Sequence, residues 1–179
     1  MFPHQFAMSI AEDLLGQIAS FCQRIEIVGS LRRQRLHVHD IDILAIPCVI
    51  KIPDTSPLGE PVTQNLLELK LGNLCRKNWF AIDPDGPKHK RLIREEQGET
   101  LPVDLYIATE ETWWTLLIIR TGSRIHNIKL ARRAHELGMK LKADGSGLLG
   151  QDGNLIPVGS EEELFELLHM SYKPPEARE

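Results

Sequence analysis

The chain has 179 residues, of which 42% are hydrophobic and 26% are charged, and its formal net charge is -4 at pH 7. These values are ordinary for a soluble globular protein and argue against a largely disordered chain. No apolar run approaches the roughly 20 residues that a membrane helix needs, and the N-terminus lacks the pattern of a secretion signal.

The three cysteines, at positions 22, 48 and 75, form no CxxC pair. This odd, scattered set argues against a disulfide framework and a structural zinc site, and it predicts reduced thiols in an intracellular protein. The sequence does not distinguish a cytoplasmic from a nucleoid or nuclear location. We expect Cys48 and Cys75 to be buried as small hydrophobic side chains, because they lie in or after apolar stretches.

The first part of the chain mixes predicted helices and strands. Ser9-Ile10-Ala11-Glu12 has the form of a capping box, which favours a helix beginning at Ser9. Apolar spacing then predicts, in chain order, a helix over 9–22, strands over 25–28 and 41–46, a loop over 48–61, a helix over 62–77 and strands over 88–94 and 101–107.

The second part of the chain has a different pattern. Thr109 is placed to cap a helix, and Ser123 is placed to cap another that ends at Gly138. Beyond them the sequence predicts short strands over 139–149 and 155–158, then a capping box at Ser160 and a final helix through Leu168. A boundary near 108 therefore divides a mixed α/β part from a smaller α+β part.

Two carboxylates, Asp40 and Asp42, lie two residues apart on a predicted strand. Asp40 and Asp42 therefore point to one face of a strand, with Cα atoms about 6.5–7 Å apart. Asp104 alternates with apolar residues in the same manner. If the two strands are neighbours, three carboxylates share a patch that repels itself unless cations fill it. Two divalent ions would do so, in an arrangement that suits phosphoryl transfer.

A glycine-led segment, Gly29-Ser30-Leu31-Arg32-Arg33, precedes these carboxylates. A glycine after a strand lets backbone N–H groups approach a phosphate closely. Ser30 adds a hydroxyl donor and Arg33 a bidentate cation. A triphosphate site next to the carboxylates is therefore expected.

Together these motifs resemble a known family. Gly29-Ser30, nine further residues and Asp40-Ile41-Asp42 resemble the signature of the polymerase-beta-like nucleotidyltransferase superfamily. The extended form Val28–Arg33 is similar to that of the X-family DNA polymerases, and Leu101–Leu105 supplies their third carboxylate. Thr121-Gly122-Ser123 with Asn127 resembles the start of their thumb.

This resemblance implies a nucleotidyltransferase palm over 1–108 and a small polymerase-beta-like thumb over 109–179. The family's lyase domain and helix-hairpin-helix fingers have no counterpart in the sequence. The implied activity is transfer of a nucleotide from a nucleoside triphosphate to a primer 3′-hydroxyl with release of pyrophosphate, in DNA repair or gap filling on primer-template or gapped DNA.

The resemblance also implies roles for particular residues. Two Mg²⁺ ions, with Mn²⁺ as a substitute, would be held by the catalytic carboxylates Asp40, Asp42 and Asp104. The nucleotide would be bound by Gly29, Ser30, Arg33, Gly122 and Asn127, with Arg120 and Arg124.

Some positions depart from the family pattern. Ile119-Arg120 replaces an aromatic pair that screens the sugar in many members, which predicts weaker selection against ribonucleotides. Arg120 and Arg124 either contact the triphosphate or template or are solvated. Pro102 replaces an arginine that helps to hold the primer terminus in the animal enzymes, and Ala131 replaces a template-contacting arginine of some relatives.

Between residues 120 and 142, seven cations are opposed by one carboxylate, in a chain whose total charge is negative. Such an excess suits contact with a phosphate backbone and predicts DNA binding by Lys129, Arg132 and Lys140. A solvated helix face is the alternative. His37 and His39, just before Asp40, are interpreted as a strand-edge pair, with zinc ligation as the alternative.

Two other functions stay open from the sequence. The first is a template-independent or RNA-directed nucleotidyltransferase. The second is a non-catalytic nucleic-acid-binding module descended from such an enzyme, against which the three carboxylates argue.

Overall fold

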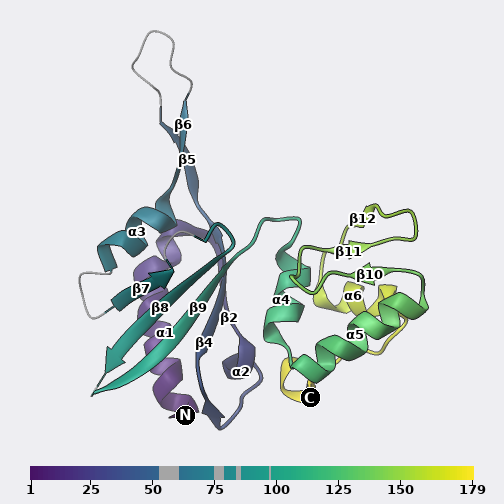
Figure 1. The fold of residues 1–179 in the computed structure, drawn as a ribbon, viewed down its shortest axis with the longest axis horizontal. Coiled ribbons are helices and arrows are strands. Elements are labelled where there is room, and N and C mark those ends of the chain that lie inside the picture. Colours follow the sequence, from purple (N-terminus) through teal and green to yellow (C-terminus); the bar gives the residue numbers. More distant parts are fainter. Residues whose placement is uncertain (53–60, 75–78, 84–85, 97) are drawn as a thin grey trace.

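The computed structural model describes residues 1–52, 61–74, 79–83, 86–96 and 98–179, with the backbone alone for 80–83. An N-terminal part built on a sheet lies beside a smaller C-terminal part of helices and short strands (Figure 1). Within the described residues, no helix is both long enough and apolar enough to cross a membrane.

A five-stranded sheet forms the centre of the N-terminal part. Its strand order is β2-β4-β9-β8-β7, in which β4 and β9 run parallel and the other neighbours antiparallel. The strands are β2 (Cys22–Val28), β4 (Ile41–Pro47), β7 (Trp79–Asp83), β8 (His89–Glu96) and β9 (Glu99–Ile107). The predicted strands over 25–28, 41–46 and 101–107 are thus confirmed with extended bounds, the one over 88–94 is confirmed but shifted to 89–96, and β7 was not predicted.

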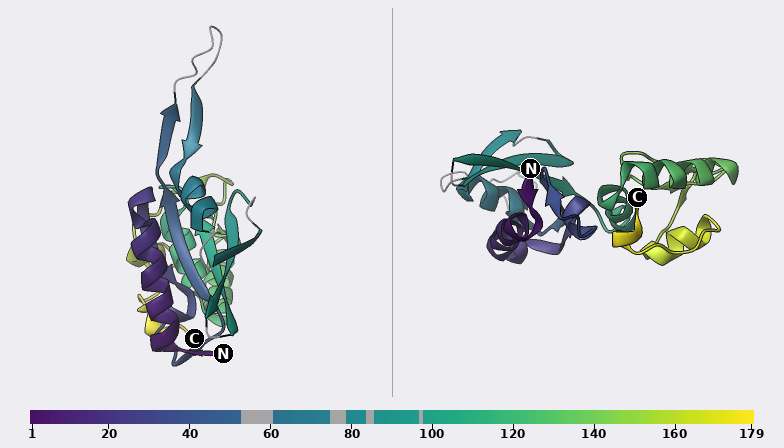
Figure 2. Two further views of the ribbon diagram at one scale, coloured as in Figure 1. Left: turned by 90° about the vertical axis from the view of Figure 1, so that its left-hand side faces the viewer. Right: turned by 90° about the horizontal axis from the view of Figure 1, so that it is seen from below.

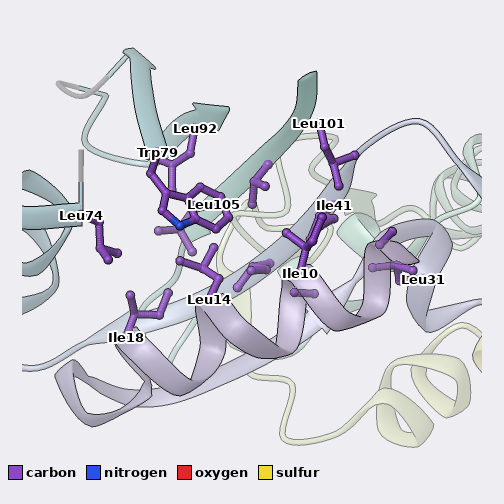
Figure 3. Packing of buried hydrophobic residues seen from close by; sticks show 14 of the residues in the cluster. Ile10, Leu14, Ile18, Leu31, Ile41, Leu74, Trp79, Leu92, Leu101 and Leu105 are labelled. Atoms are coloured by element: carbon purple, nitrogen blue, oxygen red, sulfur yellow. The ribbon is translucent and has the colours of Figure 1, made fainter. Parts of the chain in front are cut away.

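One face of this sheet is covered by helices α1 (His4–Ile18) and α3 (Leu66–Leu74). Figure 3 shows Ile10, Leu14 and Ile18 of α1 directed at the sheet. Because side chains alternate along a strand, Ile41 and Ile43 of β4 join this core, and Asp42 points to the opposite face.

The opposite face packs against α4 (Trp113–Thr121). Leu44 and Ile46 of β4 form a core with Trp113 and Leu117, all of them buried. This contact fixes the C-terminal part against the sheet on the face that carries Asp42.

The C-terminal part has its own core around Ile118, Leu130 and Phe165. Its other elements are α5 (Arg124–Glu136), α6 (Glu161–Leu167), the 3-10 turn η2 (Pro175–Ala177) and a three-stranded sheet of β10 (Lys140–Leu141), β11 (Leu148–Leu149) and β12 (Leu155–Ile156).

The remaining elements are short. A hairpin of β5 (Val49–Ile52) and β6 (Val62–Asn65) projects from the body of the molecule, as the left view in Figure 2 shows. The others are β1 (Phe2–Pro3), which pairs with β3 (His37–Val38), the 3-10 turn η1 (Ala19–Phe21) and the one-turn helix α2 (Gly29–Arg32).

Several predicted bounds are wrong. Helix α1 begins at His4, and Ser9 lies inside it with its hydroxyl donated to the carbonyl of Phe6. Thr109 does not cap α4, because the chain makes a further turn and Thr112 occupies the cap position without a side-chain bond.

The region after β4 also differs from the prediction. Residues 49–52 form β5 instead of a loop, since their backbone pairs with β6, and 62–65 belong to β6 instead of a helix. Cys48 is half-buried instead of buried, and its thiol is free, as is that of Cys22. Cys75 and the predicted segments 53–60 and 75–77 lie outside the described residues.

Two caps of the C-terminal part, at Ser123 and Ser160, are as predicted. The Ser123 hydroxyl accepts a hydrogen bond from the amide of His126, and α5 is followed by Gly138 with φ +72°. The Ser160 hydroxyl accepts one from the amide of Glu163 at 3.0 Å.

Candidate active site

Asp42 and Asp104 lie side by side at the centre of the sheet. Strands β4 and β9 are parallel neighbours, and their register pairs Asp42 directly with Asp104. Asp42 is half-buried and Asp104 is 7% exposed. Asp40 lies one residue before β4, instead of on the strand as expected, and is half-buried.

Burial and the neighbouring carboxylates make Asp42 harder to ionise. The pKa of Asp42 is raised to about 7, first because the group is buried and then because the charges of Asp40 and Asp104 are near. A hydrogen bond from Tyr106 and the charge of Arg33 act in the opposite direction. Such a concentration of negative charge is relieved by a bound cation.

Each of the two paired carboxylates is already held by a side chain from the sheet. The Tyr106 hydroxyl donates to Oδ1 of Asp42 at 3.3 Å, and Nε2 of His89 lies 2.9 Å from Oδ1 of Asp104. In this conformation, no group of three or more His, Cys, Asp or Glu side chains of the described residues is assembled to hold a metal ion.

The backbone of Gly29 approaches the Asp42 carboxylate closely. A Cβ built on Gly29 would lie 1.9 Å from Oδ2 of Asp42, and the φ of Gly29 is +65°. The next residue, Ser30, has a buried hydroxyl oxygen without a hydrogen-bond partner among the described residues. A free donor therefore lies next to the carboxylates, as the motif predicts.

A cavity of about 680 Å³ lies between the two parts of the chain. Its N-terminal wall includes Gly29, Ser30, Arg33, Asp40 and Asp42, together with His37 and His39. The facing wall includes Arg120, Gly122, Arg124, Asn127, Ile128 and Ala131. The cavity thus joins the predicted nucleotide-binding residues with two of the three carboxylates; Asp104 does not line it.

The Thr-Gly-Ser segment meets the glycine-led segment across this cavity. Nη1 of Arg33 donates to the carbonyl of Thr121. Gly122 has φ +71°, and a Cβ there would lie 3.0 Å from the same Nη1. Nδ2 of Asn127 donates to the carbonyl of Ile119 at 2.8 Å, while its Oδ1 is buried without a partner among the described residues.

Arg120 and Arg124, which the sequence leaves as either nucleotide or template contacts or solvated residues, differ in their environment. The guanidinium of Arg120 lies 4.1 Å from the centroid of the Tyr106 ring, which brings it close to Asp42. Arg124 is exposed in the first turn of α5 and lines the cavity.

A buried ion network joins the two parts beside the cavity. Glu161 bonds to Arg32 with both carboxylate oxygens at 2.8 Å and to Arg178 at 2.8 Å. Arg32 also donates to the Thr121 hydroxyl at 2.8 Å. Arg178 is fully buried, so this network fixes α2 to the C-terminal part through charge-assisted bonds.

The residues predicted to bind DNA lie on the outer surface. Lys129, Arg132 and Lys140 are exposed, and none lines the cavity. Arg132 is paired with Glu136 at 3.1 Å, and its side chain is 81% exposed.

Sequence reasoning missed His89 and Tyr106. Tyr106 lies two residues after Asp104 on the same strand, so the strand pattern alone places both side chains on one face of the sheet. His89 is brought to Asp104 by the pairing of β8 with β9, which no local pattern reveals.

Comparison with known proteins agrees with this geometry. Residues 116–179 match the family model of the DNA polymerase beta thumb. The chain is 31% identical over 180 residues to "DNA polymerase/3'-5' exonuclease PolX" of Bacillus subtilis, in a match that covers 99% of the chain and 28% of that relative. It is 27% identical over 173 residues to "Repair DNA polymerase X" of African swine fever virus (Warthog isolate), which covers 94% of the chain and 90% of the viral protein.

The fold and the site together define the class of protein. A mixed α/β unit with paired carboxylates, followed by a polymerase-beta thumb, is a palm-plus-thumb protein, as the resemblance implied. The chain belongs to the X family of DNA polymerases.

Proposed function

We propose that this chain is a DNA polymerase that transfers a nucleotide from a nucleoside triphosphate to a primer 3′-hydroxyl in DNA repair or gap filling. The observation that carries the proposal is the pairing of Asp42 with Asp104 beside a cavity walled by both parts of the chain. Membership of the X family implies metal-dependent catalysis on DNA with nucleoside triphosphates.

The carboxylates fit divalent cations. Oxygen-only donors suit Mg²⁺ and Mn²⁺. The pKa of Asp42 is raised first by burial and then by the charges of Asp40 and Asp104, and a bound cation would neutralise those charges. Asp40, Asp42 and Asp104 would hold two such ions once their side chains converge. Bound magnesium supplies neutralisation of the triphosphate and polarisation of the primer hydroxyl.

The protein's own groups would orient the nucleotide. The unpartnered Ser30 hydroxyl donates to a phosphate oxygen, and Gly29 lets the backbone approach it. Arg33 supplies positive charge from the same wall of the cavity. Asn127, with a buried free Oδ1, faces the nucleotide from the thumb beside Gly122.

The palm is assigned to residues 1–108 and the thumb to 109–179. This division is supported by the separate hydrophobic cores of the two parts, although α4 contributes to a third core shared with the sheet. We assign contact with the DNA backbone to three residues on the outer face of the thumb, namely Lys129, Arg132 and Lys140.

The experiment is extension of a labelled primer by the wild-type chain on matched template, gapped and single-stranded DNA, with magnesium or manganese. Template-directed growth is the expected result. Growth that ignores the template would instead identify a terminal transferase, and no growth on any substrate would favour a non-catalytic binding module.

A further inference from the structure

His89 contacts the proposed catalytic centre, yet no motif assigns it a role. It is the first residue of β8, and its Nε2 lies 2.9 Å from Oδ1 of Asp104. The His89 side chain is 40% exposed and that of Asp104 is 10% exposed. The imidazole therefore forms part of the boundary between this carboxylate and the solvent.

The ring of His89 is held in place by a neighbouring aromatic ring. His89 is paired across the strands with Tyr106, and the two rings stack with centroids 5.0 Å apart and an interplanar angle of 25°. Tyr106 is held in turn by its bond to Asp42 and by the guanidinium of Arg120. The direction of the bond from His89 to Asp104 is thus set by the sheet.

Arg91, a cation near Asp104, does not offer the same constraint. Nε of Arg91 is 3.8 Å from Oδ1 of Asp104, beyond hydrogen-bond distance, and its side chain is 44% exposed. Arg91 contributes positive charge, whereas His89 contributes a directed bond.

We propose that His89 is a positioning residue of the active site. Its Nε2–H donates to Oδ1 of Asp104, fixes the rotation of the carboxylate and leaves the second oxygen for a divalent cation. Groups that bond to metal-ligating carboxylates orient them in this manner, and their removal typically costs about 10–100-fold in metal affinity. The inference rests on the proposed function, because it requires Asp104 to be a ligand.

The test uses two substitutions of His89 and one control in the full chain. His89→Gln retains an N–H donor at a similar reach, and His89→Leu removes the donor while retaining apolar area for Tyr106. His135→Leu is the matched control, since His135 is exposed on α5 and does not line the cavity. Mn²⁺ binding is measured by electron paramagnetic resonance without DNA, and thermal unfolding is measured in parallel without metal.

The expected result is that His89→Leu weakens Mn²⁺ binding by about 10-fold or more, while His89→Gln and His135→Leu bind as the wild type does. Thermal unfolding of all the variants stays close to that of the wild type. In primer extension, His89→Leu lowers kcat and leaves the KM for DNA unchanged.

Unchanged Mn²⁺ affinity in His89→Leu would overturn the inference, as would equal losses in the Leu and Gln variants or a loss that only follows reduced stability. A wild type without Mn²⁺ binding would overturn it as well. A wild type that binds Mn²⁺ but extends no primer would contradict the proposed function alone, because the contribution of His89 to cation binding would still be measured.

Discussion

At the scale of single residues, the site depends on a contact that only glycine allows. The backbone of Gly29 lies against Oδ2 of Asp42, and its positive φ disfavours any side chain. We expect Gly29→Ala to displace the carboxylate, to lower the free energy of unfolding by about 1–3 kcal/mol and to reduce primer extension at least about tenfold.

Thermal unfolding and steady-state extension measure both effects. Gly16→Ala is the matched control, because a Cβ at Gly16 in α1 meets nothing within 4 Å and alanine favours a helix. A Gly29→Ala variant as stable and active as the Gly16→Ala variant would show that the contact is unimportant.

Sugar selection is a second property, which we expect to depend on the Ile119-Arg120 pair. Arg120 stands where many family members have an aromatic residue, and its guanidinium is held over Tyr106. We expect comparable kcat/KM for ribonucleotides and deoxyribonucleotides in the wild type, and a shift toward deoxyribonucleotides in Arg120→Phe. Strong exclusion of ribonucleotides by the wild type would contradict this expectation.

The candidate site could be predicted only in part from the sequence. Asp42, Asp104 and Ser30 were predicted because the motifs and the strand alternation are local. The pairing of His89 with Asp104 depends on the register of two strands, and the bond from Arg33 to Thr121 joins residues 88 positions apart. Long-range contacts of this kind leave no periodic signal.

At the scale of elements, the predictions succeeded where local chemistry decides the structure. Ser123 and Ser160 cap their helices as expected, because a hydroxyl oxygen there satisfies a free amide. The same reasoning failed for Ser9. Its hydroxyl bonds backward to Phe6, and the pairing of β1 with β3 places the helix start at His4.

Helix α5 contains a buried histidine, His126, from which we expect the thumb to lose stability in acid. His126 is 2% exposed and stacks on Phe165, and burial lowers its pKa to about 4, with further lowering by the charges of Arg178, Lys173 and Lys129. An unperturbed histidine, as in an unfolded chain, has a pKa of about 6.5. The unfolded chain therefore binds more protons between these values, so stability is present above pH 6.5 and is lost as the pH falls toward 4.

We expect the free energy of unfolding to fall by about 2 kcal/mol between pH 7 and pH 5 through this residue. Urea unfolding at both pH values, compared between the wild type and His126→Asn, isolates the contribution. An equal fall in the His126→Asn variant would assign the acid sensitivity to other groups.

At the scale of the whole molecule, the sequence predicted two parts with different architectures, and the structure adds how they meet. The α4 core and the Glu161 network join them, so the cavity has walls from both. This arrangement could not be predicted, because Arg32 and Glu161 are ordinary surface residue types until the fold brings them together.

The charge distribution of the molecule predicts how DNA binding responds to salt. The net charge is -4, while the exposed thumb surface carries Lys129 and Lys140. We expect DNA affinity to fall with salt, with a log–log slope of about -0.9 for each phosphate contact on duplex.

Lys129→Ala and Lys140→Ala should each make that slope shallower by about 1 and weaken binding on all sequences alike. Lys70→Ala is the control, because Lys70 lies on α3, on the face of the sheet away from the cavity. Affinity that is insensitive to salt in the wild type would exclude a phosphate-binding surface on the thumb.

The most direct test of the account is the rate of single-nucleotide incorporation by Asp42→Asn and Asp104→Asn, measured with magnesium beside the exposed control Glu12→Gln. We predict a loss of at least about a thousandfold in both aspartate variants, equivalent to about 4 kcal/mol of transition-state stabilisation, with folding retained and the control unchanged. Rates close to that of the wild type in either aspartate variant would contradict the assignment of this carboxylate pair as the catalytic centre.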